Sequence, residues 1–251
     1  AASDVYKRQS LLMRERTEDM WRFELVTANR NSIGSLHAFI ISDEQERAVA
    51  YVAFQQYGAG FFVHELGVVP GHSWRSVGLF VTRDLKRRAD KLNKEREKPI
   101  GHITFPMSDN HPLVEALGGQ LEKRRKPYAW YIRVPDLHGF VRHITPVLER
   151  RIVNSVVAGH TGTLRLNLYR DSMVLTIDGG LITKVGRYEP KHVEDADALF
   201  PELTFLQLLF GYRSYEELDA AFADCYADKA EAAVLLNVLF PKRPSFVRGL
   251  N

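Results

Sequence analysis

The first part of the chain combines one stretch of helical periodicity with three stretches of strand-like composition. Apolar residues within 19–26 recur at helical spacing, and Asn, Ser and Gly residues then break the pattern. Three segments rich in aromatic and β-branched residues follow at 36–41, 47–57 and 61–69, separated by short turns. The pattern predicts a helix of about three turns followed by three antiparallel strands.

Helices and strands alternate in the next part of the chain. A helix is predicted over 76–94, because its apolar residues share one face and its basic residues the other. A strand follows at 100–105, a short helix begins at Pro112 and ends at Gly118, and an aromatic-rich strand covers 128–134. The apolar face of the long helix consists of Leu79, Phe80, Leu85, Ala89 and Leu92.

A second pattern begins after Pro135. A helix with a regular apolar stripe is predicted over 136–152, where Asp136 stands at the capping position. Alternating apolar and polar residues at 163–169, 172–177 and 181–185 then predict a three-stranded meander with a glycine-containing turn. Three helices complete this part, at 204–210, 215–226 and 229–240.

The predicted architecture is therefore α+β with two domains. Residues 10–135 form a mixed, mostly antiparallel sheet with flanking helices, and residues 136–251 form a smaller α+β domain. Residues 1–9 contain neither an initiating Met nor a cleavable apolar stretch. We interpret them as a non-native leader, and we expect sequence to be missing at both ends.

Composition limits the class of protein. Hydrophobic residues make up 45% of the 251 residues and charged residues 26%, which is ordinary for a globular chain and excludes a disordered or coiled-coil protein. No apolar stretch approaches the roughly 18 residues that a membrane-spanning helix needs. The single cysteine, Cys225, excludes an intrachain disulfide and a thiolate metal cluster. We expect a cytoplasmic protein that binds no membrane and no metal.

The net charge of +3 says little about partners, but basic residues concentrate at 83–98 and at 123–126. A solvated helix face and a charged turn explain these runs more simply than a binding surface does. Because no aromatic platform is interleaved with the charges, we expect no nucleic-acid partner.

The stretch from Glu65 to Leu79 is the most informative one for function. It reads as a strand, a short loop with small residues, and the beginning of a helix. This geometry directs backbone N–H groups and the positive end of a helix dipole at one point, which suits a pyrophosphate. Many ordinary strand-to-helix connections also have small residues, so the pattern alone leaves a purely structural turn open.

These residues and the order of elements resemble the GNAT superfamily of N-acetyltransferases. Val68-Val69-Pro70 matches the end of that family's central strand. The second part of the chain is similar to the sterol-carrier-like domain of the enhanced-intracellular-survival type of acetyltransferase. The segments LYRDSMVLTIDGGLITKV and LLFGYRSYEEL carry this second similarity. The resemblance implies a GNAT-type sheet in 10–135 and a sterol-carrier-like domain in 136–251.

The resemblance implies an acetyl-CoA-dependent N-acetyltransferase in which a primary amine attacks the thioester directly. Glu65 is the preferred general base, and His64, expected on the opposite side of the strand, is its rival. The implied cofactor-binding residues are a strand segment, a helix start and an asparagine. They are Leu66, Gly67 and Val68 along the pantetheine arm, Arg75, Ser76, Val77, Gly78 and Leu79 around the pyrophosphate, and Asn110.

Other assignments stay open from the sequence. The acceptor is a small-molecule or peptidyl amine, whether an aminoglycoside, a polyamine, another small amine or a lysine side chain. No general acid is identified, and a homo-oligomer is compatible with the sequence. The alternative function is a non-catalytic module with a degenerate GNAT domain that binds a ligand or a partner protein.

Overall fold

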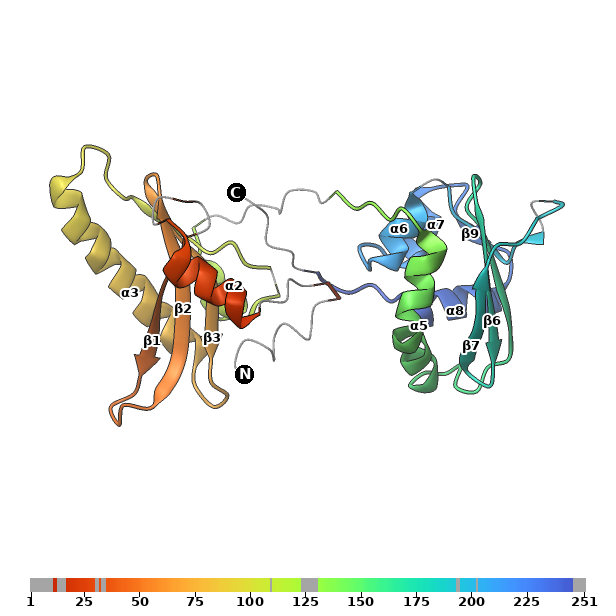
Figure 1. Cartoon of the computed structure of the whole chain (residues 1–251), viewed down its shortest axis with the longest axis horizontal. Coiled ribbons are helices and arrows are strands. Elements are labelled where there is room, and N and C mark those ends of the chain that lie inside the picture. Colours follow the sequence, from red (N-terminus) through yellow and green to blue (C-terminus); the bar gives the residue numbers. More distant parts are fainter. Residues whose placement is uncertain are drawn as a thin grey trace. The chain divides into compact units, whose positions relative to one another are not determined.

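The computed structural model describes residues 11–12, 17–29, 32, 35–108, 110–122, 131–192, 195–201 and 203–245. They form two units, the first with the described residues up to 122 together with Ser245, the second with residues 131–244. Each unit is α+β and has its own mixed sheet, of four strands in the first and five in the second (Figure 1). The predicted leader, residues 1–9, lies outside the described residues.

The first unit contains the elements predicted for its described part. Its helix α2 continues directly into a π-helical turn, η1, and the three strands follow as a double hairpin. In chain order the elements are α2 (Glu18–Arg22), η1 (Phe23–Thr27), β1 (His37–Ser42), β2 (Ala48–Tyr57), β3 (Gly60–Val68), α3 (Trp74–Leu92), η2 (Asn93–Glu95), β4 (His102–Thr104), α4 (Pro112–Leu117) and η3 (Gly118–Gln120).

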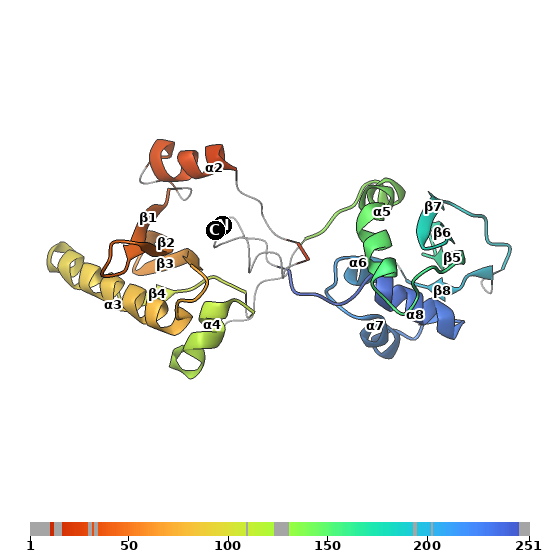
Figure 2. The same ribbon diagram turned by 90° about the horizontal axis from the view of Figure 1, so that it is seen from below.

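The sheet of the first unit has the order β1-β2-β3-β4. The two hairpins are antiparallel, as predicted, and β4 pairs with β3 in parallel. One face is covered by α3, whose fully buried Val81 and Leu85 belong to the same apolar core as Leu66 of β3. Helix α2 lies on the opposite side of the sheet (Figure 2). The beginning of this unit's sheet is tied to η1 by a hydrogen bond from Leu36 N to Glu24 O.

The second unit is built around the predicted meander. Its sheet has the order β7-β6-β5-β8-β9, and α5 and α8 lie on one side of it (Figure 1). The elements are α5 (Leu137–Val153), β5 (Gly162–Asn167), β6 (Ser172–Asp178), β7 (Leu181–Gly186), β8 (Ala198–Leu199), α6 (Thr204–Leu209), α7 (Tyr215–Ala221), β9 (Tyr226–Ala227) and α8 (Ala230–Leu239).

Two predicted elements differ from the structure. Residues 131–134 of the predicted strand 128–134 are not in a strand, and residues 128–130 lie outside the described part of the chain. The helix predicted over 215–226 ends at Ala221, because the chain turns back to pair Tyr226 with Leu199. The Tyr215 hydroxyl accepts a hydrogen bond from the Ala227 N–H at 2.8 Å and fixes this return.

Candidate functional site

A β-bulge in β3 creates the most distinctive polar position of the first unit. Ala53 of β2 lies opposite Glu65 and Phe54 lies opposite Val63, so His64 is the extra residue. Val63 and Leu66, on either side of His64 and Glu65, both pack into the core with α3. The bulge therefore turns His64 and Glu65 toward the same face, away from α3. The prediction that these two side chains lie on opposite sides of the strand is wrong.

Strands β3 and β4 pair only ahead of the bulge, and we call the β3 edge beyond their last pair the fork. Parallel pairing stops at Phe62 and Thr104, whereas β3 continues to Val68. The Val69 N–H donates a hydrogen bond to Val49 O of the neighbouring strand β2. Backbone groups of successive residues in a strand point to alternate sides, so those of Leu66 and Val68 point away from β2. Among the described residues no strand covers this edge. The backbone donors and acceptors of this edge are thus unpaired by any described strand, and the residues that carry them, Leu66 and Val68, are 0% and 4% exposed.

The Glu65 carboxylate lies buried at the base of the fork, with only 5% of the residue exposed. Its Oε1 accepts a hydrogen bond of 2.9 Å from the Tyr51 hydroxyl. The Tyr51 ring also covers Gly67, where an added Cβ would lie 2.2 Å from Cε1 of that ring. The edge of Trp21 from α2 approaches Tyr51 with a centroid separation of 6.2 Å. Aromatic rings therefore fix the carboxylate on this face.

His111 is a second buried polar residue of the first unit, and the sequence pattern did not predict a role for it. It caps α4, with Nδ1 accepting a hydrogen bond of 3.2 Å from the Leu113 N–H. The ring of Trp74, the first residue of α3, meets it edge to face at 5.3 Å. Burial lowers the pKa of His111 to about 4, and the opposing charge of Glu65 acts in the upward direction. The imidazole is therefore neutral at physiological pH.

The beginning of α3 holds fewer accessible N–H groups than the sequence predicted. The Ser73 hydroxyl caps the helix by accepting from Ser76 N at 3.2 Å, and Ser73 O accepts from Val77 N at 3.0 Å. The Arg75 side chain donates to Ala116 O of α4 at 3.3 Å. Within the described part of the chain, the Arg75 N–H has no hydrogen-bond acceptor. One predicted donor thus remains available at this turn.

The other predicted cofactor residues have packing roles. An added Cβ at Gly78 would lie 2.4 Å from Cδ1 of Leu113, so this glycine permits close contact between α3 and α4. Val77 is buried in the core and Leu79 packs against it, whereas Asn110 is exposed in the turn before α4. Phe80 and Leu92, both predicted on the buried face of α3, are 45% and 44% exposed. Phe80 therefore turns toward solvent.

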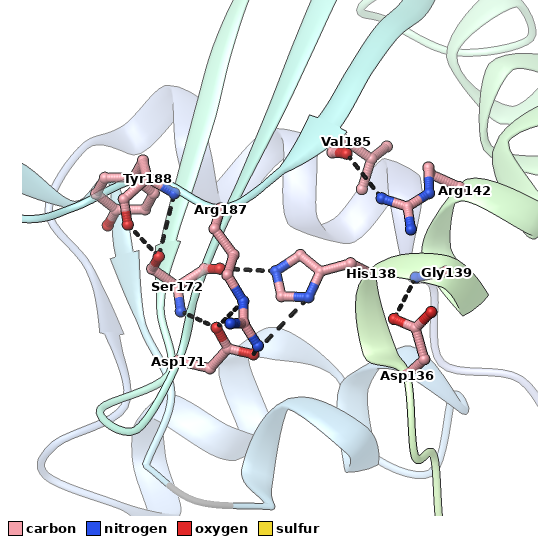
Figure 3. A network of polar contacts seen from close by, with 9 residues as sticks. All are labelled: Asp136, His138, Gly139, Arg142, Asp171, Ser172, Val185, Arg187 and Tyr188. Atoms are coloured by element: carbon pink, nitrogen blue, oxygen red, sulfur yellow. Dashed lines mark hydrogen bonds and ion pairs between the residues drawn. The ribbon is translucent and has the colours of Figure 1, made fainter.

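A second polar network lies in the second unit and joins α5 to the meander (Figure 3). His138 Nε2 hydrogen-bonds to Ser172 O at 2.8 Å, and its Nδ1 lies 3.8 Å from Asp171 Oδ2. The Arg187 guanidinium pairs with the same carboxylate at 3.0 Å. The Ser172 hydroxyl donates to the Tyr188 carbonyl, so it is not placed as a nucleophile beside the imidazole. This network holds the fold together.

Comparisons with known proteins add no family. No protein-family model matches the chain, and no curated protein matches it. The part of the chain that the structure describes contains no group of three or more His, Cys, Asp or Glu residues placed to hold a metal ion. None of its helices has the length and apolar character needed to cross a membrane.

Proposed function

We propose that the chain is a cytoplasmic, acetyl-CoA-dependent N-acetyltransferase of the GNAT type, with the second unit as a sterol-carrier-like domain. The fork between β3 and β4 is the observation that carries the proposal. It places an edge of β3 that no described strand pairs, at the buried residues Leu66 and Val68, beside the buried carboxylate of Glu65 and ahead of the first turn of α3. A thioester carrier and an acid–base group are needed together for this chemistry.

The residues at the fork fit the pantetheine arm of acetyl-CoA better than its pyrophosphate. The amide groups of a pantetheine arm have the spacing to pair with the backbone of Leu66 and Val68, as an added strand would. At the start of α3 the helix dipole and the Arg75 N–H favour an anion. The N–H groups of Ser76 and Val77, which were predicted to contribute, already have acceptors within the turn.

We assign to Glu65 the role of general base, which takes the proton from the acceptor amine. Acetyl-CoA supplies the thioester when it is bound, and an ammonium acceptor must lose a proton before it becomes a nucleophile. The Tyr51 hydroxyl orients the Glu65 carboxylate, which takes that proton directly or through a water molecule. His64 lies on the same face one residue earlier and stays the second candidate for this role. The acceptor is a small-molecule or peptidyl amine.

A second function has support in the turn before α3. The Ser73 hydroxyl accepts the hydrogen bond of an N–H group in the first turn of α3, and Gly78 allows the contact with α4. The turn is therefore also compatible with a protein that does not bind a diphosphate. In that case the chain is a non-catalytic ligand- or protein-binding protein with a GNAT-like first unit. Neither function requires nucleic acid, and both are compatible with a homo-oligomer.

Titration of the full chain with acetyl-CoA, followed by acetylation of a panel of amines, separates the two functions. The transferase requires heat on mixing and a raised melting temperature, whereas no response at millimolar coenzyme favours the binding module. Glu65→Gln keeps an acceptor for Tyr51 but removes the base, so kcat is expected to fall at least about 100-fold with unchanged coenzyme affinity. Glu115→Gln, at an exposed position of α4, is the matched control.

A further inference from the structure

We propose that Gly67 and Trp21 are positioning residues, which hold the ring of Tyr51 so that its hydroxyl meets the Glu65 carboxylate. The inference rests on the function proposed above, in which Glu65 is the general base. It gives Gly67 a role that acts through a neighbouring side chain, whereas the resemblance implied contact with the coenzyme.

The register of the β2–β3 hairpin determines how Tyr51 reaches Glu65. Tyr51 lies directly opposite Gly67, and Glu65 stands two residues before Gly67 on the same face of β3. A diagonal neighbour on the adjacent strand is within reach of an aromatic side chain. The Tyr51 ring therefore extends over Gly67, and its hydroxyl donates to Glu65 Oε1 at 2.9 Å.

The ring has its place because residue 67 carries no side chain. An added Cβ at Gly67 would lie 2.2 Å from Cε1 of the Tyr51 ring and 2.9 Å from its Cδ1 and Cζ. A glycine inside a strand costs stability, and it often marks a point where another group comes close to the backbone. Here that group is the ring that carries the hydrogen bond to Glu65. Any larger residue at this position would displace it.

The backbone of Gly67 is directed toward β2 and away from the fork. The Val69 N–H donates to Val49 O of β2, and the backbone groups of residues two apart in a strand point to the same side. Those of Gly67 therefore face β2, where Tyr51 is its direct partner. A pantetheine arm along the fork would pair with the residues before and after Gly67. The Tyr51 ring, and not the coenzyme, accounts for this glycine.

Trp21 of α2 constrains the same ring. The rings of Trp21 and Tyr51 meet in a T-shaped arrangement, with 6.2 Å between their centroids and 80° between their planes. Aromatic pairs of this geometry contribute stability beyond the area that they bury. Helix α2 lies on the side of the sheet opposite α3, which is the side that carries Tyr51 (Figure 2). Two separate elements, β3 and α2, thus hold the ring.

The test compares Gly67→Ala in the wild type and in Tyr51→Phe. The Tyr51→Phe background keeps the ring that the added methyl group would displace, but it lacks the hydroxyl. Crystal structures give the distance from the Tyr51 oxygen to Glu65, thermal unfolding gives stability, and steady-state kinetics give kcat and the KM for acetyl-CoA. Gly186→Ala in β7 is the matched control, because an added Cβ there would lie at an ordinary 3.6 Å from Lys184 Cε.

In the wild type, Gly67→Ala is expected to break the 2.9 Å contact between Tyr51 and Glu65. The value of kcat should fall roughly 10- to 100-fold with an unchanged KM for acetyl-CoA. In the Tyr51→Phe background the same substitution should lower the melting temperature as much but leave kcat unchanged, because the hydroxyl is already absent. The proposal is overturned if the contact survives Gly67→Ala, or if kcat falls equally in both backgrounds.

Trp21→Leu approaches the same question without altering β3. It should also lower kcat in the wild type and not in Tyr51→Phe, and an equal fall in both backgrounds would overturn the proposal. This comparison decides the matter if Gly67→Ala does not fold. A wild type that binds no acetyl-CoA refutes the proposed function instead. The crystal structures of the variants then still show whether Gly67 and Trp21 hold Tyr51 on Glu65.

Discussion

Glu149 of α5 accepts a hydrogen bond from the backbone N–H of Ile182, with 2.9 Å between Oε1 and N. Ile182 belongs to β7, which forms one edge of the five-stranded sheet. Two turns earlier on the same helix, Arg142 donates to Val185 O at 3.3 Å (Figure 3). Side chains of α5 therefore occupy a donor and an acceptor of an edge strand, which would otherwise be a template for pairing with another chain. At the fork in the first unit no described strand pairs with β3 beyond Phe62.

Removing both side chains is expected to open this edge. The double variant Arg142→Ala/Glu149→Ala leaves the Ile182 N–H and the Val185 carbonyl available, so strands of two molecules can pair. Sedimentation velocity over a range of concentrations should show larger species than the wild type forms. Arg150→Ala, at an exposed position of the same helix, is the control and should behave as the wild type does. Identical sedimentation of the double variant would show that the edge is protected by other means.

The strands and helices were predictable wherever local pattern decides structure. The alternation over 163–169 and the glycine-containing turn at Asp178 specify the meander without help from the rest of the chain. The strands β8 and β9 have two residues each, too few to show any alternation. Their pairing depends on contacts between distant segments, which the sequence pattern does not contain.

The candidate site was predictable only in part, for a related reason. The sequence identified Glu65 and the strand that carries it, but the segment around His64 is apolar or aromatic on both sides, so no change of period marks the bulge. Tyr51 reaches Glu65 through the register of the β2–β3 hairpin. His111 is placed at the cap of α4 and against Trp74 of α3 by the packing of these two helices. The local sign of its capping role was its position directly before Pro112 at a helix start.

His111 is expected to make the first unit less stable in acid. Its pKa in the folded state, about 4, lies below the ordinary 6.5, so the unfolded chain takes up a proton first as the pH falls. The contribution to stability is complete above pH 6.5 and is lost as the pH falls toward 4. Between pH 7 and pH 5 the loss is about 2 kcal/mol. Urea unfolding at the two pH values should show this loss in wild type and a smaller one in His111→Asn. Equal losses would assign the effect to other groups.

Asp197 is expected to be a major determinant of stability in the second unit. The residue is 4% exposed. Its carboxylate accepts a hydrogen bond from the Arg165 N–H at 2.8 Å and forms an ion pair with Lys229 at 2.6 Å. This hydrogen bond to Asp197 also raises the pKa of Lys229. Asp197→Ala leaves the strand N–H without its acceptor and should lower the free energy of unfolding by about 3 kcal/mol. Asp219→Ala, at an exposed site on α7, should change it little. A small effect at Asp197 would mean that solvent replaces its partners.

Gly78 separates a packing role from a phosphate-binding role. An alanine in an exposed helix would gain about 1 kcal/mol of stability over glycine. At this position the new methyl would lie 2.4 Å from Leu113 Cδ1, and overpacking of this kind costs about 1 to 3 kcal/mol. We therefore expect Gly78→Ala to lower the melting temperature of the otherwise wild-type chain.

Leu113→Ala supplies the matched background for that measurement. It removes the atom that the Gly78→Ala methyl would meet, so the same glycine substitution should there be neutral or stabilising. Acetyl-CoA titration of the four proteins completes the cycle. If Gly78 serves helix packing, coenzyme affinity follows stability and recovers in the Leu113→Ala background. If the glycine instead lets the backbone approach a phosphate, Gly78→Ala lowers the affinity equally in both backgrounds.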